Sequence, residues 1–221
     1  MDSTKRRPTT VIANEPVSST AFELFLERQG MEFQAGELVS LYGAGPLDAR
    51  DYTIASGIHD EHLKVLYRLM PEGVLTPQLA GLKPGDSLDI AGPYGTFTVR
   101  DPEVPMVFIA TGTGIAPCHA FAESFPALEL TILHGCAVAE DLFYRDTLSR
   151  YSYLPCVSGE TVDGFRGRVT HRLESLELDH EAHYYLCGAN EMIYEVQDML
   201  AQRGLDQQRI FTEPYYYRAD D

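Results

Sequence analysis

The sequence predicts two domains of different class: an antiparallel β-barrel over residues 1–101 and a doubly wound parallel α/β domain over residues 102–221. Short alternating segments separated by glycine and proline turns fill the first hundred residues, which is typical of a barrel. From Asp101 and Pro102 onward, short apolar runs alternate with helical patterns, as in a parallel sheet covered on both faces. At 221 residues, the chain is long enough for two domains.

The first domain is predicted from strands, turns and one short helix. Strands are expected over residues 20–26, 37–42 and 63–69, and turns at residues 43–46, 84–86 and 92–95. The helix is expected over residues 75–82, with Thr76 as its N-cap and Pro77 at its first position.

The second domain is predicted from a βαβ rhythm. Strands are expected over residues 106–110, 130–134, 154–157, 184–187 and 210–212. Helices are expected over residues 116–124, 140–149, 169–175 and 191–203, the last ended by Gly204. His134 ends one of these strands and is interpreted as a core residue.

The most informative stretch runs from Val107 to Pro117, where an apolar strand ends in Gly112-x-Gly114 and a helix follows. Glycines let the backbone turn tightly and approach a ligand, and the free N–H groups of a helix N-terminus attract an anion. The stretch therefore predicts a phosphate-binding loop.

Composition excludes several classes of function. The net charge is −16 and most of the acidic excess lies in the second half, which argues against nucleic acid as a partner. The four cysteines are widely spaced and form no C-x-x-C or C-x-x-H pattern, so no zinc or iron–sulfur site is expected. The sequence has no apolar run of membrane-spanning length and no signal-peptide pattern, so we expect a cytoplasmic protein.

Four motifs occur in one order: Arg50-Asp51-Tyr52-Thr53, Gly73-Val74-Leu75-Thr76, Gly112-Thr113-Gly114-Ile115-Ala116-Pro117 and Cys187-Gly188. This ordered set, on a barrel followed by an α/β domain, resembles the ferredoxin–NADP reductase family, including its compact bacterial members and oxygenase reductase modules. The resemblance covers about residues 10–215. It implies a Greek-key barrel that binds FAD and a domain that binds NADH or NADPH. It also implies hydride transfer between NAD(P)H and the flavin, with single electrons passed to or from a carrier such as ferredoxin or flavodoxin.

The resemblance assigns roles in the first domain. Arg50 would contact a flavin phosphate, Tyr52 would lie against the isoalloxazine ring, and Thr53 would hydrogen-bond near the reacting nitrogen. An arginine fork matches phosphate and an aromatic face covers an aromatic ring, so the chemistry is consistent. The other predicted flavin contacts are Ile54, Arg68, Gly73, Val74, Leu75 and Thr76.

The resemblance also assigns roles in the second domain. The dinucleotide loop would comprise Thr111, Gly112, Thr113, Gly114 and Pro117, with proline where the dehydrogenase pattern has a third glycine. Cys187 would support the reacting nicotinamide carbon, with Gly188 beside it. Glu213 would assist proton movement and Tyr215 would cover the second flavin face, although Tyr216 or Tyr217 could take that place.

Several alternatives stay open. Reductases that use NADPH tend to carry an arginine where this chain has Gly159, and Glu160 and Asp163 would repel a 2′-phosphate, so NADH is favoured; Arg166 and Arg168 could compensate. The chain could instead reduce free flavin or quinones, or act as a non-catalytic flavin-binding subunit. An acidic ferredoxin would need a basic patch, and the candidates are Lys5, Arg6, Arg7, Arg28, Lys64 and Lys83.

Overall fold

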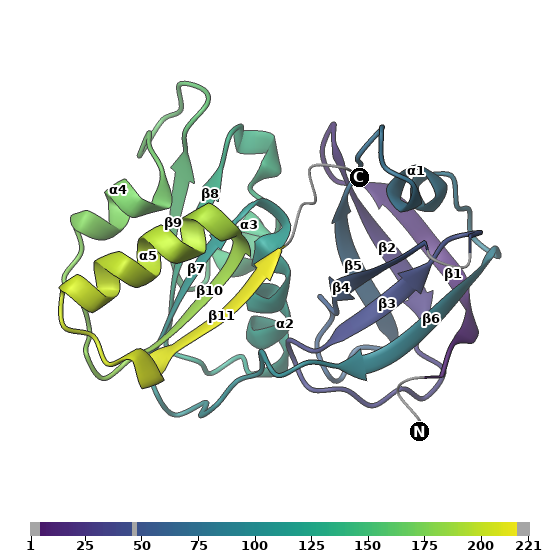
Figure 1. Ribbon diagram of the computed structural model, residues 1–221, viewed down its shortest axis with the longest axis horizontal. Helices are drawn as coiled ribbons and strands as arrows, with labels where there is room; N and C mark the ends of the chain where they lie inside the picture. The colour runs from purple at the N-terminus through teal and green to yellow at the C-terminus, as the bar shows by residue number, and fades with distance from the viewer. Residues whose placement is uncertain (1–4, 46–47, 216–221) are drawn as a thin grey trace. The chain divides into compact units, whose positions relative to one another are not determined.

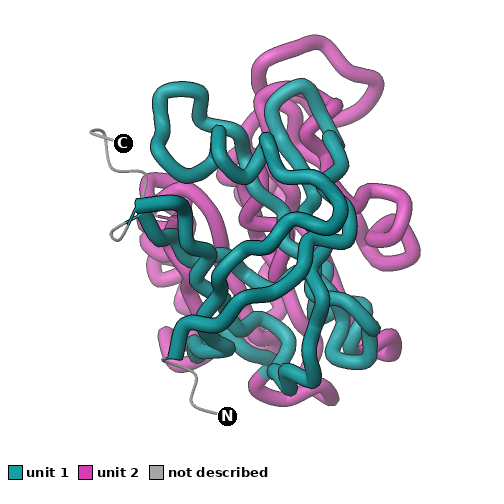
Figure 2. The backbone as a smooth tube through the Cα atoms, turned by 90° about the vertical axis from the view of Figure 1, so that its right-hand side faces the viewer, with its two compact units in different colours: residues 1–99, 119–124, 217–221 teal, residues 100–118, 125–216 magenta. Residues whose placement is uncertain are grey.

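The computed structural model describes residues 5–45 and 48–215, which form two compact units. Of the described residues, unit 1 comprises 5–45, 48–99 and 119–124, and unit 2 comprises 100–118 and 125–215 (Figure 2). Helix α2, Ala116–Ser124, is divided between the units after Cys118. None of the helices in the described part is long and apolar enough to cross a membrane.

Unit 1 is built on one antiparallel six-stranded sheet with the strand order β4-β3-β6-β1-β2-β5 (Figure 1). Its strands are β1 (Arg7–Pro16), β2 (Ala21–Glu27), β3 (Leu38–Tyr42), β4 (Ala49–Thr53), β5 (His62–Arg68) and β6 (Ser87–Tyr94). Helix α1 spans Leu75–Ala80. Strands β4 and β5 are therefore the two edges of the sheet.

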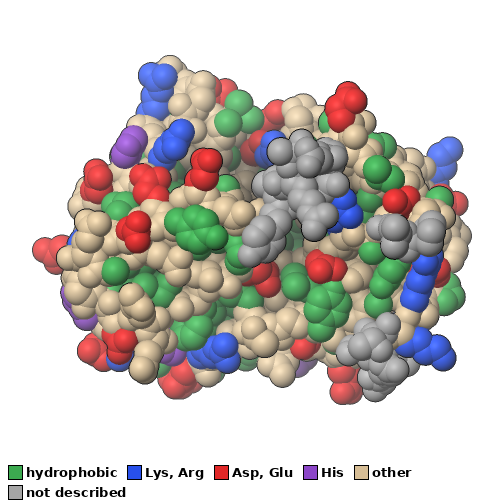
Figure 3. All heavy atoms as spheres, in the orientation of Figure 1, with side chains coloured by type: hydrophobic (Ala, Val, Ile, Leu, Met, Phe, Trp, Pro, Cys, Tyr) green, Lys and Arg blue, Asp and Glu red, His purple; other side chains and the backbone are tan. Residues whose placement is uncertain are grey.

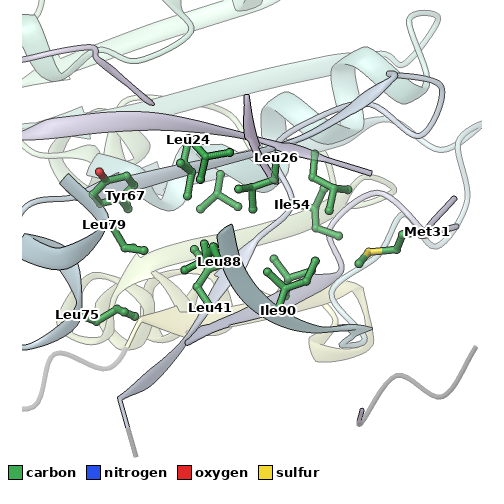
Figure 4. Close-up of a cluster of buried hydrophobic side chains, with 14 of the residues drawn as sticks. Leu24, Leu26, Met31, Leu41, Ile54, Tyr67, Leu75, Leu79, Leu88 and Ile90 are labelled. Carbon is green, nitrogen blue, oxygen red and sulfur yellow. The ribbon is translucent and has the colours of Figure 1, made fainter. Parts of the chain in front are cut away.

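The core of unit 1 fills the inner face of this sheet. Alternate residues of each strand point inward, so leucines and other apolar side chains from five strands and from α1 meet there. Figure 4 shows Tyr67, Leu79 and Leu75 at one end of this core and Met31 at the other. This packing attaches α1 to the end of the barrel that carries the predicted flavin motifs.

Unit 2 is built on a parallel five-stranded sheet with the order β11-β10-β7-β8-β9. Its strands are β7 (Met106–Thr111), β8 (Leu130–Cys136), β9 (Ser152–Val157), β10 (His183–Ala189) and β11 (Ile210–Tyr215). The helices are η1 (Gly112–Ile115), α2, η2 (Ala139–Asp141), α3 (Arg145–Leu148), α4 (Val169–Glu174), α5 (Asn190–Gln202) and η3 (Gln207–Arg209). Helices α4 and α5 cover one face of the sheet (Figure 1).

The predicted fold class is confirmed, but several local predictions are wrong. The expected turn at residues 92–95 lies mostly inside β6, because Gly92 and Pro93 continue the strand as far as Tyr94. The expected helix over residues 140–149 is broken into η2 and α3, since Tyr144 adopts a left-handed conformation with φ of 57°. Helix α1 ends two residues earlier than predicted.

Candidate functional site

The first group of predicted residues lies on β4, an edge strand of unit 1. Arg50 and Tyr52 pair with Leu41 and Val39 of β3, so they share a face with these two buried side chains. Arg50 is exposed, and its Nη1 donates to the carbonyl oxygen of Ala49 at 2.9 Å; Tyr52 is half-buried. A cation and an aromatic ring thus project from one face of the edge strand, which suits a phosphate joined to a flat ring system.

Thr53 and Ile54 differ from these two residues because unit 1 already buries them. Thr53 is 3% exposed and Ile54 is fully buried. Thr53 pairs with Leu38, so its side chain points to the opposite face from Tyr52. A ligand on the same face as Tyr52 could therefore contact only the backbone of Thr53, and not its side chain.

Behind Tyr52 lies a partly buried polar pair, Tyr67 and Asn14, that local sequence patterns do not predict. The ring of Tyr67 on β5 meets the ring of Tyr52 edge-on, with centroids 6.4 Å apart. Burial raises the pKa of Tyr67 to about 12, so its hydroxyl stays protonated and donates to Oδ1 of Asn14 at 3.0 Å. Asn14 in turn donates from Nδ2 to the carbonyl of Leu79 in α1 at 2.8 Å. Asn14 and Leu79 are 65 residues apart, so local sequence patterns do not predict this link.

Helix α1 begins differently from the prediction. Leu75 is its first residue and Val74 its N-cap, so Thr76 lies inside the first turn and does not cap the helix. The Thr76 hydroxyl instead accepts from the Met70 N–H at 2.8 Å and donates to the Met70 carbonyl at 3.2 Å. Gly73 donates to the same carbonyl at 2.9 Å. Thr76 thereby fixes the turn that leads into the helix.

Arg68 and the basic residues of unit 1 do not gather at this edge. Arg68 follows Tyr67 on β5, so its side chain points to the opposite face. Arg28 donates to the carbonyls of Met31, Ile58 and Asp60 at 2.6–2.8 Å. Arg6 pairs with Asp89 at 2.7 Å, and Lys64 lies 3.8 Å from Glu23. On the face drawn in Figure 3, acidic side chains are scattered and form no single patch.

The second group of predicted residues forms the turn from β7 into η1. Thr111 is the N-cap, and Gly112 has a left-handed φ of 53°, which glycine adopts without strain. A Cβ on Gly114 would lie 2.4 Å from the carbonyl oxygen of Cys187. A Cβ on Gly188 would lie 2.3 Å from Oγ1 of Thr111. The two glycine motifs therefore pack directly against each other, and this close approach explains Gly114 and Gly188 without any ligand.

Hydrogen bonding completes this junction. The N–H of Ala189 donates to Oγ1 of Thr111 at 3.0 Å. Thr113 and Pro117 are buried, so Pro117 presents no exposed side chain to a ligand. At the carboxyl edge of the sheet, the loop carries the backbone N–H groups of the first turn of η1. Such N–H groups suit an anionic phosphate.

Cys187, Glu213 and Tyr215 lie together at the same edge. In the parallel pairing of β10 with β11, Cys187 is the partner of Glu213 and Ala189 the partner of Tyr215. Cys187 is fully buried, and burial raises the pKa of its thiol well above the usual value, while the hydroxyl of Tyr215 lowers it. A protonated, buried thiol is a poor nucleophile, so the site offers a small polarisable group and not a covalent catalyst. Tyr216 and Tyr217 lie outside the described residues.

Unpartnered buried polar atoms occur at this edge of unit 2. In the described part of the chain, four side-chain atoms of unit 2 are buried without a hydrogen-bond partner: Oγ1 of Thr170, Nε of Arg172, Nδ1 of His183 and Oδ1 of Asn190. Thr170 lies in the first turn of α4 and Asn190 is the first residue of α5. Both helices begin at the carboxyl side of the sheet, where open α/β sheets bind nucleotides.

The loop expected to choose the dinucleotide is tightly held. The N–H of Gly159 donates to the carbonyl of Ala137 at 2.8 Å, and a Cβ at this glycine would lie 2.7 Å from the same oxygen. The carboxylate of Glu160 accepts a hydrogen bond from the N–H of Ala139, the first residue of η2. A negative charge is therefore fixed between the loops that follow β8 and β9.

Comparison with known proteins agrees with this arrangement. Residues 9–99 match the family described as "Oxidoreductase FAD-binding domain", and residues 108–198 match the family described as "Oxidoreductase NAD-binding domain". The chain is 30% identical over 234 residues to ferredoxin–NADP reductase B of Sorangium cellulosum, covering 93% of this chain and 96% of that protein.

Longer proteins are also similar. The electron transfer component of toluate 1,2-dioxygenase from Pseudomonas putida is 30% identical over 199 residues, covering 84% of this chain but 59% of that protein. The chain thus spans about three fifths of the length of that relative. Among solved structures, a cytochrome P450 reductase of Amycolatopsis has a TM-score of 0.85 and 26% identity, covering 96% of this chain and 70% of that one. A ferredoxin NADP+ reductase from Neisseria gonorrhoeae with bound FAD and NADP has a TM-score of 0.87 at 18% identity, covering 96% and 99% of the two chains, and shares the fold.

Proposed function

Because the chain belongs to the ferredoxin–NADP reductase family, with an FAD-binding and an NAD-binding domain, we propose that it is an NADH-dependent flavoprotein reductase. Electrons would pass from NADH through FAD to a redox protein such as a ferredoxin, a flavodoxin or an oxygenase component. One observation carries the proposal: a single chain holds an aromatic and cationic edge in unit 1 and a glycine-packed phosphate loop in unit 2. We propose residues 1–101 and 102–221 as the two domains, and a cytoplasmic location.

When bound, the flavin supplies the conversion of a two-electron hydride into single electrons. The residues of this chain would bind the flavin and the dinucleotide and orient them. Arg50 would neutralise a phosphate, and Tyr52, supported by Tyr67, would give the ring a flat support. The turn Gly73–Thr76 would offer the first backbone N–H groups of α1 to the diphosphate. Ile54 belongs to the same proposed site through its position after Thr53.

In unit 2 the backbone provides most of the proposed contacts. Residues 111–114 offer N–H groups to the dinucleotide diphosphate. Cys187 and Gly188, near the end of β10 at the carboxyl edge of the sheet, would lie beside the nicotinamide ring. Glu213 would hold a proton near the reacting atoms, and Tyr215 would cover the flavin.

We propose NADH over NADPH because the carboxylate of Glu160 would repel a 2′-phosphate. Gly159 also supplies no cation to bind that phosphate. Comparing kcat/KM for the two dinucleotides tests this choice. We expect a preference for NADH, and a preference of more than about tenfold for NADPH would contradict it.

The experiment that tests the function starts with the absorption spectrum of the purified protein. We expect a flavin spectrum and, after acid release, FAD. Electron acceptors are then compared with NADH as donor: a ferredoxin, a flavodoxin, free flavin and a quinone. Faster reduction of the protein carriers supports the proposal.

A second candidate, a reductase of free flavin or quinones, is favoured by one observation. Of the six cations proposed for a basic patch, Arg6 and Lys64 already pair with Asp89 and Glu23, which lowers the positive charge that unit 1 presents to an acidic protein. Faster reduction of free flavin or quinone than of any protein carrier would establish this second function. A protein that binds flavin but is not reduced by NADH would instead be a non-catalytic subunit.

A further inference from the structure

His134 on β8 is buried, and both of its ring nitrogens have a partner. Its side chain is fully shielded from solvent. Nδ1 lies 2.9 Å from the hydroxyl oxygen of Tyr153 on β9, and Nε2 lies 3.0 Å from the carbonyl oxygen of Gly112. One side chain thus joins the dinucleotide loop to the strand two positions away from β7 in the sheet.

The partners determine the tautomer. A carbonyl oxygen only accepts, so Nε2 must carry the proton and donate to Gly112. Nδ1 of the neutral ring then accepts, and the Tyr153 hydroxyl donates to it. Burial lowers the pKa of His134 to about 4 and raises the pKa of Tyr153, so the neutral imidazole and the protonated phenol are both favoured.

This chain of hydrogen bonds fixes one peptide plane in the loop. The peptide joining Gly112 to Thr113 is planar and trans, so its C=O and N–H point in opposite directions. Because the carbonyl is held toward the buried His134, the N–H of Thr113 points away from that ring. Gly112 itself is in a left-handed conformation with φ of 53°, which glycine adopts without strain, so the bond from His134 holds a turn that the backbone already permits.

We propose that His134 is a positioning residue that orients the dinucleotide loop through the Gly112 carbonyl, with Tyr153 fixing its tautomer. This inference depends on the proposed function, since the loop is taken to bind NADH. His134 touches neither the substrate nor the reacting atoms. Its removal should therefore weaken dinucleotide binding and leave the hydride step unchanged once the dinucleotide is bound.

Two isosteric variants separate the two hydrogen bonds of His134. The amide of glutamine can place its N–H near the Nε2 position, so His134→Gln keeps the bond to Gly112. The shorter asparagine reaches only the Nδ1 position, so His134→Asn keeps the bond to Tyr153 and loses the bond to the Gly112 carbonyl. Tyr153→Phe removes the hydroxyl and leaves the bond to Gly112 in place.

The test measures NADH binding and hydride transfer separately on the flavin-loaded full chain. The dependence of the flavin reduction rate on NADH concentration gives a Kd and a limiting rate. We expect the Kd to rise about tenfold or more in His134→Asn, about threefold in Tyr153→Phe and by less than threefold in His134→Gln. All three limiting rates should stay within about twofold of the unmodified protein.

A second readout does not depend on activity. NAD+ should raise the thermal unfolding temperature of the unmodified protein and of His134→Gln, and raise that of His134→Asn less at the same concentration. If glutamine impairs binding as much as asparagine, or if neither does, the positioning role is overturned. If the unmodified protein shows neither reduction by NADH nor stabilisation by NAD+, the proposed function itself fails, and the inference with it.

Discussion

The two proposed half-sites are built in different ways. In unit 1, side chains on an edge strand carry the site: Arg50 is exposed and Tyr52 half-buried, and the core beneath them is complete. In unit 2, backbone N–H groups of the loop after β7 form the proposed site. Gly114 and Gly188 have no room for one extra carbon atom. The dinucleotide loop is therefore part of the packing of unit 2, whereas the flavin edge is an addition to the fold of unit 1. Substitutions of the loop glycines in unit 2 should damage stability, whereas substitution of the exposed Arg50 in unit 1 should damage mainly flavin binding.

The largest expected effect on stability comes from Gly114→Ala and Gly188→Ala. Each new methyl group would overlap backbone or Thr111, and Gly188 also has a φ of 129°, so we expect each to lower the free energy of unfolding by about 3 kcal/mol or more. Urea denaturation measures this change.

Two other glycines are matched controls for this prediction. Gly81 has a negative φ and ordinary contacts, so Gly81→Ala should change little. Gly204 has a φ of 80° in open space, so Gly204→Ala should show the cost of the backbone alone, about 1 kcal/mol. If Gly114→Ala costs no more than Gly81→Ala, the loop is not part of the packing of unit 2.

A pH titration should give an effect of similar size and addresses one buried histidine in each unit. Burial lowers the pKa of both His119 in unit 1 and His134 in unit 2 to about 4. The unfolded chain takes up these protons near pH 6.5, whereas the folded chain resists them until about pH 4. The free energy of unfolding should therefore fall as the pH drops from 6.5 to 4, by up to about 1.4 kcal/mol per pH unit for each histidine.

Variants that keep one hydrogen bond assign this loss to each unit. Asparagine can replace the Nδ1 donor that His119 offers to the carbonyl of Ala55, 2.7 Å away, and glutamine can replace the Nε2 donor of His134. His119→Asn and His134→Gln should each flatten the fall between pH 6.5 and 4 in urea denaturation. An unchanged slope in both variants would show that other groups cause the loss.

Thr76→Ala should have a smaller effect, confined to unit 1. It removes both hydrogen bonds with Met70, so we expect a loss of about 1 kcal/mol in the free energy of unfolding and weaker FAD binding. Thr76→Ser keeps the hydroxyl and should behave like the unmodified protein. A serine variant as impaired as the alanine variant would argue that the methyl group, and not the hydrogen bonds, matters.

The smallest effect on stability is expected for Arg50→Ala, whose side chain is exposed: less than about 0.5 kcal/mol without flavin. Combined with Tyr52→Ala it should nevertheless yield colourless protein, because the proposed flavin contacts are lost. The flavin absorbance per mole of protein measures this. Lys83→Ala, an exposed cation elsewhere in unit 1, should keep its flavin, and retention of stoichiometric flavin in the double variant would refute the site.

This contrast also explains what the sequence could predict. The motifs on β4 and after β7 depend on local patterns: alternation places Arg50 and Tyr52 on one face, and glycines mark the turn at Gly112. The fold class follows from the same local periodicity. These features were therefore predictable without knowledge of distant contacts.

Long-range partners could not be predicted in this way. Asn14 supports α1 through Leu79, 65 residues away, and His134 holds Gly112, 22 residues away. Nothing near Thr76 in the sequence shows that its hydroxyl turns back to Met70 and does not cap α1. Gly114 and Gly188 were predicted as ligand contacts, and only the structure shows that their missing side chains are needed for packing.

Anaerobic rapid mixing of the purified flavin-containing chain with NADH tests hydride transfer to the flavin directly. We expect the absorbance of oxidised flavin to be lost in one phase whose rate saturates with NADH concentration. A chain that binds no FAD, or that keeps its flavin oxidised at every NADH and NADPH concentration, would contradict the proposed function.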